Sequence, residues 1–391
     1  MLPETAFRMP AEWETHEATW LGWPHELTDW PGKFAPIPWA FAEIVRHLAR
    51  VERVFLLVES AAAESRAKAV LRKAGADLDM VRFFRIPTDR GWMRDSGPIA
   101  VVESPAPTVI PNAPVQFGAE ESASGFETVQ QIPRRPRSGL ARDDSPQENS
   151  ALLNFVFNGW AKYDDYKKDA KVVSRANAKL KRRVVLPEHK GRRVVLEGGA
   201  IDVNGSGTLL TTEECLLSKT QERNPGFTRD DYAEVFRRYF GATNVLWLKR
   251  GIAGDDTHGH VDDLARFVDP TTVVTAIEQD PAEDNYAPLQ ENFALLREMK
   301  DQDGRPLRVE TLPMPAPVYF AGQRLPASYA NFYIANGIVL VPTFNDPADR
   351  IALNTLAKLF PARKIVPIYC RDLVLGLGTI HCMTQQLPRI D

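Results

Sequence analysis

Apolar residues recur along the chain in a unit of two short apolar runs around a turn, a stretch with helical spacing, and a further apolar run. Three such hairpins lie at residues 200–210, 264–276 and 331–342. The first and third turn at Asn-Gly, a strong hairpin signal, and the second turns at Asp-Pro. After each hairpin, apolar residues at helical spacing predict a helix, at residues 228–240, 288–300 and 346–360. A strand is predicted after each helix, at residues 244–248, 307–312 and 364–368.

The N-terminal part of the chain varies this unit. Strands are predicted at residues 19–23, 54–58 and 81–86, with helices at 38–50 and 61–73 between them. Strand-strand-helix-strand at a recurring period is typical of a closed array of like units. We therefore predict an α/β fold in which residues 1–391 form a single domain built as a ring of repeats.

Residues 103–150 interrupt the pattern between two apolar runs, 99–102 and 152–157, that are expected to pair as a hairpin. The segment contains many Pro, Ser and Arg residues and little periodic apolar pattern. Such a composition cannot bury enough surface to offset chain entropy. We predict a flexible loop inserted in the hairpin. An arginine-rich docking peptide is the less favoured alternative.

Composition narrows the class of protein. The 391 residues carry a formal net charge of −3, so no overall basic field favours nucleic acid or an anionic membrane as a partner. No apolar run reaches the roughly 18 residues of a membrane span, and the N-terminus lacks the pattern of a secretory signal. The odd count of 3 cysteines fits free thiols in a reducing compartment. We expect a cytoplasmic protein, and the sequence leaves open whether it forms a homo-oligomer.

Candidate chemistry lies in four segments. Cys382 stands on a glycine-containing stretch, residues 376–388, although a buried thiol that acts as a small hydrophobe is common. Three loops, residues 88–98, 196–199 and 254–263, each precede the first strand of a hairpin. Equivalent loops of a ring of repeats converge at one mouth. The residues expected to gather there are Asp95, Glu197, His260, Asp262 and Cys382.

Some of these residue types also suit a metal site or the protein core. His258 and His260, with Asp256 and Asp262, supply the ligand types of a divalent metal, but no further cluster completes a defined set. A single Trp such as Trp92 is more often a core residue than a ligand platform. A cysteine nucleophile needs a base, and the base needs an orienting group. The chain has more acids than that triad requires, which indicates a cationic substrate.

Several short sequence motifs, in order along nearly the whole chain, resemble those of the agmatine deiminases. That family consists of guanidino-group-modifying enzymes and shares motifs with bacterial peptidylarginine deiminases. The matching motifs occupy residues 9–13, 18–21, 29–34, 92–98, 157–160, 197–199, 255–262, 328–332 and 376–388. The insertion at 103–150 is the main departure, and it leaves every motif in place. The resemblance implies a pentein fold, a five-bladed α/β propeller of ββαβ repeats.

The resemblance also implies a reaction and roles. Agmatine is hydrolysed to N-carbamoylputrescine and ammonia, a step of putrescine biosynthesis, without a metal or organic cofactor. Cys382 is the implied nucleophile and His260 the acid and base, with Glu197 holding the His260 ring. Asp95 and Asp262 are the implied carboxylates that hold the planar guanidinium, a geometry that suits two acids.

The ammonium end of the substrate needs a negative or narrow apolar site. We expect Asp256 to bind the ammonium group. Trp92 or Trp160 is expected to line the sides of the channel for the methylene chain. Asn331 and Gly378 are expected to supply further contacts. A peptidylarginine deiminase is the alternative within enzymes, although such bacterial enzymes are exported. A non-catalytic pentein and a metal-dependent hydrolase are further alternatives.

Overall fold

The computed structural model describes residues 6–104 and 149–389. Most of the expected insertion, residues 105–148, therefore lies outside the described residues. The strands on either side of it, β5 (Ile99–Ser104) and β6 (Ser150–Leu153), pair antiparallel with Ile99 opposite Leu153. The hairpin expected from these two apolar runs is confirmed.

Three sheets repeat one local design, an antiparallel hairpin followed by a helix and a strand that returns parallel to the second hairpin strand. The first contains β10 (Asp202–Val203), β11 (Thr208–Thr212), α6 (Arg229–Phe240) and β12 (Asn244–Leu248). The second contains β13 (Ala265–Asp269), β14 (Thr272–Ile277), α7 (Tyr286–Glu298) and β15 (Arg308–Pro313). The third contains β18 (Tyr333–Ala335), β19 (Ile338–Thr343), α8 (Pro347–Leu359) and β20 (Lys364–Tyr369). The repeated unit predicted from the apolar pattern is confirmed in these sheets.

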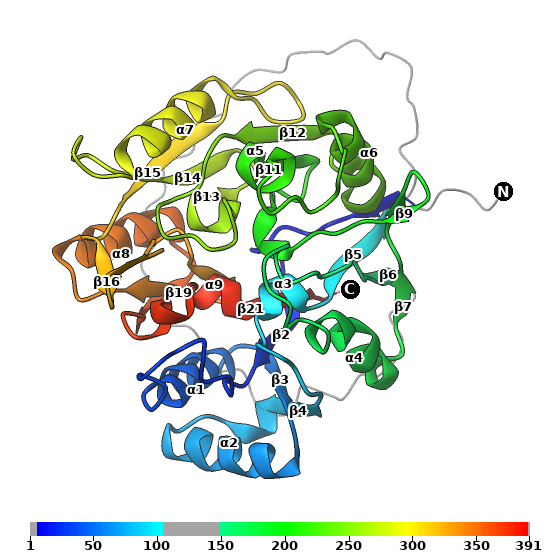
Figure 1. Cartoon of the computed structure of the whole chain (residues 1–391), viewed down its shortest axis with the longest axis vertical. Helices are drawn as coiled ribbons and strands as arrows, with labels where there is room; N and C mark the ends of the chain where they lie inside the picture. The colour runs from blue at the N-terminus through cyan, green and yellow to red at the C-terminus, as the bar shows by residue number, and fades with distance from the viewer. Residues whose placement is uncertain (1–5, 105–148, 390–391) are drawn as a thin grey trace, which may run out of the picture.

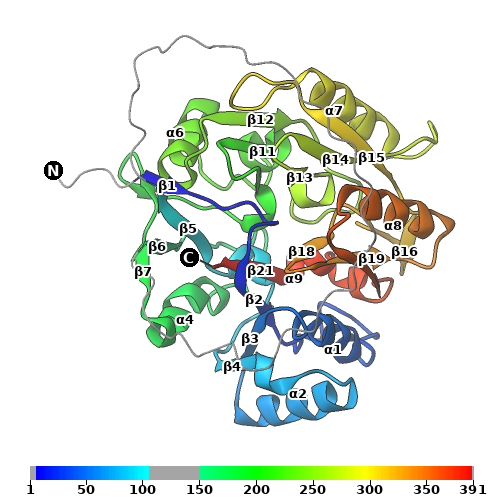
Figure 2. The same ribbon diagram turned by 180° about the vertical axis from the view of Figure 1, so that it is seen from behind.

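Two four-stranded sheets extend the same design with a chain terminus. One has the order β1-β5-β6-β7 and includes β1 (Ala6–Arg8), α4 (Val172–Leu180) and β7 (Arg183–Val185). The other has the order β21-β2-β3-β4 and includes β2 (His16–Gly22), α1 (Ile37–Leu48), β3 (Arg53–Val58), α2 (Ala61–Lys73), β4 (Val81–Arg85) and β21 (Thr384–Pro388). The last strand thus pairs antiparallel with a strand near the N-terminus, which joins the two ends of the described chain (Figure 2).

Short elements complete the description of residues 6–104 and 149–389: α3 (Met93–Ser96), α5 (Glu213–Leu217), α9 (Ile380–Met383), β8 (Glu188–His189), β9 (Arg192–Arg193), β16 (Val318–Phe320), β17 (Gln323–Leu325), and the 3-10 turns η1 (Leu78–Met80), η2 (Asp169–Lys171), η3 (Gly198–Ala200), η4 (Val261–Asp263) and η5 (Leu373–Gly376). Within the described ranges, no helix is long and apolar enough to cross a membrane.

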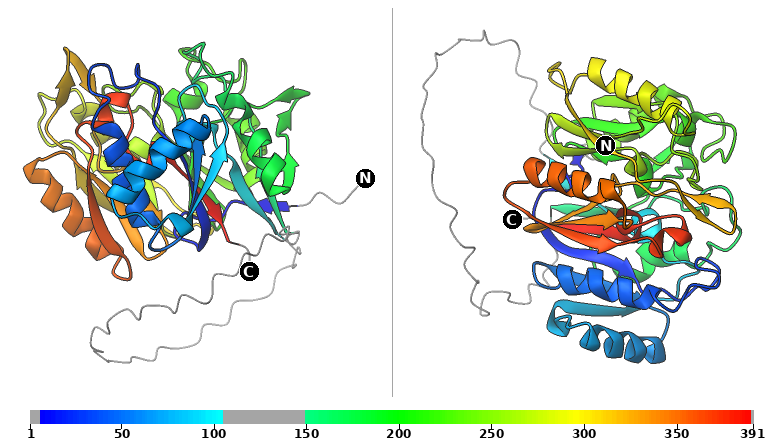
Figure 3. Two further views of the ribbon diagram at one scale, coloured as in Figure 1. Left: turned by 90° about the horizontal axis from the view of Figure 1, so that it is seen from below. Right: turned by 90° about the vertical axis from the view of Figure 1, so that its left-hand side faces the viewer.

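The long helices surround the centre of this mixed α/β fold. Figure 1 shows α1, α2, α4, α6, α7 and α8 at the periphery, whereas the short helices α3 and α9 lie near the middle. In the right-hand view of Figure 3, α7 lies at one end of the molecule and α2 at the opposite end. The central zone is therefore built from element ends and short turns.

Local chemistry explains where the peripheral helices begin and end. A capping box of Thr228 and Asp231 opens α6, and Gly241 ends it in a left-handed conformation with φ of 70°. The capping box of α8 uses Asp346, with Pro347 at the first helical position. The apolar face of such a helix packs on its sheet. In α6 this face includes the buried side chain of Tyr232.

Candidate active site

Four short turns carry the candidate residues to the centre of the fold. Asp95 lies in α3, and Glu197 directly precedes η3. His260 directly precedes η4, and Asp262 lies within that turn. Cys382 lies in α9, immediately before β21. The turns α3, η3 and η4 each lead into the first strand of a hairpin, and the four turns form contacts in the chain α9–α3–η3–η4. The structure thus brings together all five residues that the loop positions grouped.

The thiol of Cys382 is buried against polar groups. Its Sγ lies 3.0 Å from Asn331 Nδ2 and 3.7 Å from Asp262 Oδ2. Asn331 Oδ1 accepts hydrogen bonds from the Thr379 hydroxyl at 2.8 Å and from the His381 amide at 3.0 Å, which anchors the helix that carries the thiol. Burial raises the pKa of Cys382 well above its usual value, and the neighbouring carboxylates raise it further.

Gly378 leaves room for this thiol. A Cβ added to Gly378 would lie 3.0 Å from Cys382 Cβ, 3.2 Å from its Sγ and 3.0 Å from the Trp92 ring. A side chain at this position would crowd both neighbours, which would have to move by a few tenths of an ångström. The role of Gly378 is therefore to permit close approach of the backbone to the thiol and the indole.

The imidazole of His260 lies between two carboxylates. Its Nδ1 is 3.9 Å from Asp95 Oδ1, and its Nε2 is 3.8 Å from Glu197 Oε2. Burial lowers the pKa of His260, but the charge of Asp95 and the contacts with Cys215 and Glu197 raise it well above the usual value overall. The backbone amide of His260 donates to Asp255 Oδ2 at 3.1 Å, which fixes the loop.

A buried arginine stabilises the ionised form of Glu197. Its Oε1 accepts a hydrogen bond from Arg223 Nε at 3.0 Å, and neither side chain has measurable exposure. Burial alone would raise the pKa of Glu197, but the Arg223 guanidinium and the His260 ring lower it to about 2. Arg223 and His260 thus stabilise the ionised form of this carboxylate.

Asp95 and Asp262 present carboxylates to the same space. Asp95 accepts hydrogen bonds from Trp160 Nε1 at 2.8 Å and from the Gly199 amide at 3.0 Å, and burial raises its pKa. Asp262 Oδ2 accepts from His381 Nδ1 at 2.7 Å, and Oδ1 has no partner within the described protein. Burial opposes ionisation of Asp262, but His381 lowers its pKa overall.

The strained backbone at Trp160 aims the indole at Asp95. Gly159, Trp160 and Ala161 have φ of 65°, 57° and 53°, three successive residues in the left-handed region. The Asn158 side chain accepts a hydrogen bond from the Ala161 amide at 3.0 Å and stabilises this turn. Left-handed backbone at residues other than glycine is costly and is often found at functional sites.

The side chains of Trp92 and Asp256 are bound by residues outside the cluster. Trp92 packs on Trp30 with ring centroids 5.8 Å apart, and its Nε1 donates to Asp29 Oδ2 at 3.2 Å. The Asp256 carboxylate is already bound by the Lys162 ammonium and the Tyr163 hydroxyl. The structure thus places a cation at the carboxylate that we expected to receive the ammonium of the substrate.

The metal set considered from the sequence is not assembled. His258 Nε2 lies 3.1 Å from Ser218 Oγ, and among the described residues the groups close enough to share an ion do not include His258 or Asp256. Those groups are Glu197–Cys215–His260 and Asp262–Asp263–Cys382.

The sequence patterns missed several residues that complete the site. His381 bridges Asp262 and Glu12, each at 2.7 Å, and Arg223 neutralises Glu197. Asp263 accepts a hydrogen bond from Asn331 Nδ2 at 2.9 Å. His381 adjoins Cys382 in the sequence and was a readable signal, whereas no local motif marks Arg223.

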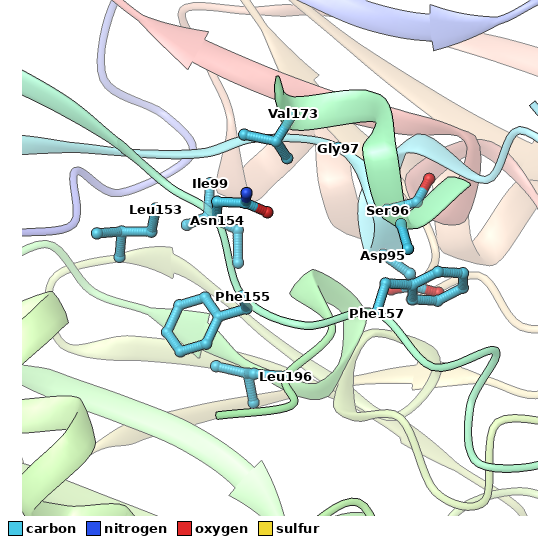
Figure 4. Close-up of a pocket in the computed structure, with 11 residues that line it drawn as sticks. Asp95, Ser96, Gly97, Ile99, Leu153, Asn154, Phe155, Phe157, Val173 and Leu196 are labelled. Atoms are coloured by element: carbon cyan, nitrogen blue, oxygen red, sulfur yellow. The ribbon is translucent and has the colours of Figure 1, made fainter. Parts of the chain in front are cut away.

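A small cavity borders the cluster on one side of Asp95 (Figure 4). Its volume is about 10 Å³, and its lining combines apolar side chains such as Ile99 and Phe155 with polar groups such as Asn154. That volume matches about one water molecule. Because the lining includes neither Cys382 nor His260, this cavity is not the place of the chemistry.

The family comparison places the chain among the guanidino-group-modifying enzymes, and its centre holds a buried thiol, an imidazole and several carboxylates. The chain belongs to the Porphyromonas-type peptidyl-arginine deiminase family, whose model matches residues 8–388. The family resemblance inferred from the sequence motifs is therefore confirmed.

Relatives within this family carry a more specific name. The chain is 32% identical to an agmatine deiminase of Medicago truncatula over 98% of this chain and 97% of the relative. It is 31% identical to an agmatine deiminase of Pseudomonas fluorescens, over 98% and 95%. Among solved structures, the agmatine deiminase of Enterococcus faecalis superposes with a TM-score of 0.80 at 26% identity, covering 100% and 99% of the two chains. A Cys-to-Ser variant of the C. jejuni agmatine deiminase with substrate bound gives a TM-score of 0.77 at 27% identity, covering 98% and 96%.

Proposed function

We propose that this protein is an agmatine deiminase, which hydrolyses agmatine to N-carbamoylputrescine and ammonia and thereby supplies putrescine biosynthesis. One observation carries the proposal. The carboxylates of Asp95 and Asp262 and the imidazole of His260 gather around Gly199, within 3.1 Å of where a Cβ on Gly199 would lie, and Asp262 Oδ2 lies 3.7 Å from the Cys382 sulfur. Two carboxylates beside one thiol and one imidazole suit a planar, permanently charged guanidinium.

The first half-reaction forms a covalent intermediate. The guanidinium is held between Asp95 and Asp262, and its positive charge offsets the carboxylates that raise the pKa of Cys382. The Cys382 thiol therefore releases its proton to solvent when the substrate binds, and the thiolate attacks the central guanidinium carbon to form a tetrahedral adduct. The C–N bond to one terminal nitrogen breaks, and that nitrogen leaves as ammonia with a proton from His260.

The second half-reaction releases the product. His260, now neutral, takes a proton from a water molecule, whose oxygen attacks the amidino carbon. The C–S bond breaks, the Cys382 sulfur leaves as thiolate, and the former guanidinium becomes the urea group of N-carbamoylputrescine. The ionised Glu197 holds the ring of His260 and favours the imidazolium that the first half-reaction requires.

The side chains of His260 and Asp262 are 1% and 0% exposed, so the substrate must place its guanidinium in the protein interior. The methylene chain of agmatine would connect that buried group to the surface. The proposed walls of the channel for this chain are Trp92 and Trp160, with Asn331 and Gly378 beside the thiol.

The acceptor of the ammonium group remains a prediction. Asp256 is the proposed acceptor, and the pairing of this carboxylate with Lys162 and Tyr163 means that the substrate ammonium must compete with a lysine. Asp256→Asn should raise KM for agmatine more than it lowers kcat. A KM unchanged within a factor of two would transfer this role to another residue.

We also propose the finer description of the fold, a five-bladed propeller that forms a single catalytic domain over residues 1–391. The five sheets of three or four strands in the described ranges, and the pairing of β2 with β21, support that proposal. Residues 103–150 are the proposed inserted loop, and the cytoplasm is the proposed location.

Comparison of three substrates tests the function. The purified chain should release ammonia from agmatine much faster than from free arginine or from an arginine peptide, and mass spectrometry should identify N-carbamoylputrescine. Cys382→Ser should abolish multiple turnover while agmatine still binds. Cys370→Ser is the matched control, since Cys370 is also a buried thiol but, among the described residues, belongs to neither group of His, Cys and acidic side chains that lie close together. Preference for the peptide, or turnover by the Cys382 variant, would overturn the proposal.

A further inference from the structure

Cys215 is a buried thiol that the proposed reaction does not use. It lies in α5, whose first turn is capped by the Thr212 side chain, and it is 1% exposed. One ligand atom each of Cys215, Glu197 and His260 lies within 4.8 Å of the other two. The thiol is thus placed on the side of the imidazole where Glu197 lies.

The ligand atoms of this group form no hydrogen bond of normal geometry within the described protein. Glu197 Oε2 and His260 Nε2 are buried 3.8 Å apart, an ion-pair distance, and neither has a hydrogen-bond partner. Arg223 binds only the other oxygen of Glu197, so it fixes the carboxylate and leaves Oε2 directed at the ring. Buried polar atoms without partners are costly and are rare in folded proteins.

The ligand chemistry selects one class of ion. A thiolate, an imidazole nitrogen and a carboxylate oxygen are the donors that Zn²⁺ uses, whereas Ca²⁺ and Mg²⁺ require sets of oxygens. Bonds of about 2.0–2.3 Å to Zn²⁺ place tetrahedral ligand atoms roughly 3.5 Å apart. Shifts of about an ångström would therefore suffice to close the triad, with a fourth position left for water.

We propose that Glu197, Cys215 and His260 form a site for Zn²⁺ that inhibits the enzyme reversibly. The ion takes the lone pair of His260 and displaces one proton from the Cys215 thiol and one from the imidazolium. His260 can then neither protonate the leaving ammonia nor activate water. The inhibitory part of this inference rests on the proposed function, but the binding part does not.

The binding test uses Co²⁺ as a spectroscopic substitute, without any measurement of activity. The wild-type chain should bind one Co²⁺ with a thiolate-to-metal charge-transfer band that added Zn²⁺ removes. Cys215→Ser should lose the band, whereas Cys370→Ser and Cys382→Ser should keep it. A band that survives in Cys215→Ser and disappears in Cys382→Ser would place the ion at the group Asp262–Asp263–Cys382 and overturn the proposal.

X-ray absorption of the Zn²⁺-loaded wild type provides a second readout that needs no variant to fold. One sulfur and two or three nitrogen or oxygen ligands are expected, and a first shell without sulfur would refute the site. Circular dichroism establishes that each variant is folded.

The activity test separates the two proposals. Zn²⁺ should stop ammonia release, a chelator should restore it, and Cys215→Ala should weaken inhibition about 100-fold, in line with losses seen for altered metal sites. Equal inhibition of the variant and the wild type would refute the inhibitory site. A Cys215-dependent cobalt band in a chain that does not turn over agmatine would refute the deiminase function alone.

Discussion

Replacement of Gly199 by alanine should lower the activity strongly and the stability only moderately. The missing side chain of Gly199 makes room for three functional groups, with His260 Nδ1 only 2.5 Å from the position that a Cβ would occupy. Real Cβ atoms do not approach other atoms this closely, so Gly199→Ala must displace the imidazole or the backbone. The backbone of Gly199 is not left-handed, so alanine meets no conformational penalty of its own.

The magnitude follows from packing and from catalytic geometry. Insertion of a methyl group into a packed interior costs about 1–3 kcal/mol in unfolding free energy. Relief of the overlap requires His260 to move by about an ångström, and a displacement of this size can cost about 100-fold in rate. We expect Gly199→Ala to fold and to lose at least about 100-fold in kcat.

The matched control is Gly226→Ala. Gly226 has φ of 81° and no atom within 4 Å of an added Cβ, so alanine there costs about 1–2 kcal/mol through backbone strain alone. Urea unfolding and ammonia release from agmatine should be measured for both variants. The two should be destabilised similarly, but only Gly199→Ala should lose activity. Similar kcat values in the two variants would refute the crowded centre on which the mechanism depends.

Three further predictions concern groups around the site. Arg223→Met leaves Glu197 buried and unpaired and should cost about 3–5 kcal/mol in urea unfolding. Lys219→Met breaks an exposed pair and should cost less than about 1 kcal/mol, so equal losses would contradict the buried pair. Burial raises the pKa of Asp169 from 3.8 to about 6, so the native state binds the extra proton and stability falls as pH rises between these values. Relative to Asp169→Asn, the wild type should lose up to about 3 kcal/mol from pH 4 to 7 in urea unfolding, and a rising difference would disprove the sign. Asn331→Asp places a negative charge 3.0 Å from the Cys382 sulfur and should move the acidic limb of the kcat/KM profile to higher pH, and an unmoved limb would count against that contact.

The hairpin units could be read from the sequence because their signals are local. The Asn-Gly pairs at Asn204 and Asn336 do form turns, with φ of 71° at Gly205 and 75° at Gly337. Helix starts such as Thr228 are equally local, since the cap and its partner are three residues apart. Asp95, Glu197, His260 and Asp262 followed from their equivalent places before hairpin strands, and Cys382 followed from its place near the end of the last unit.

The sequence by itself therefore determined the repeated unit, the family and the residues expected at the centre. Only the tertiary structure decided which charges meet there. Glu12 reaches His381 across 369 residues, Arg223 neutralises Glu197, and Asp256 is paired with Lys162. These contacts depend on how distant loops pack, and neither spacing nor residue type encodes that packing locally. Turn and helix signals act over a few residues, whereas the electrostatics of a buried site is the sum over segments that only the folded chain brings together.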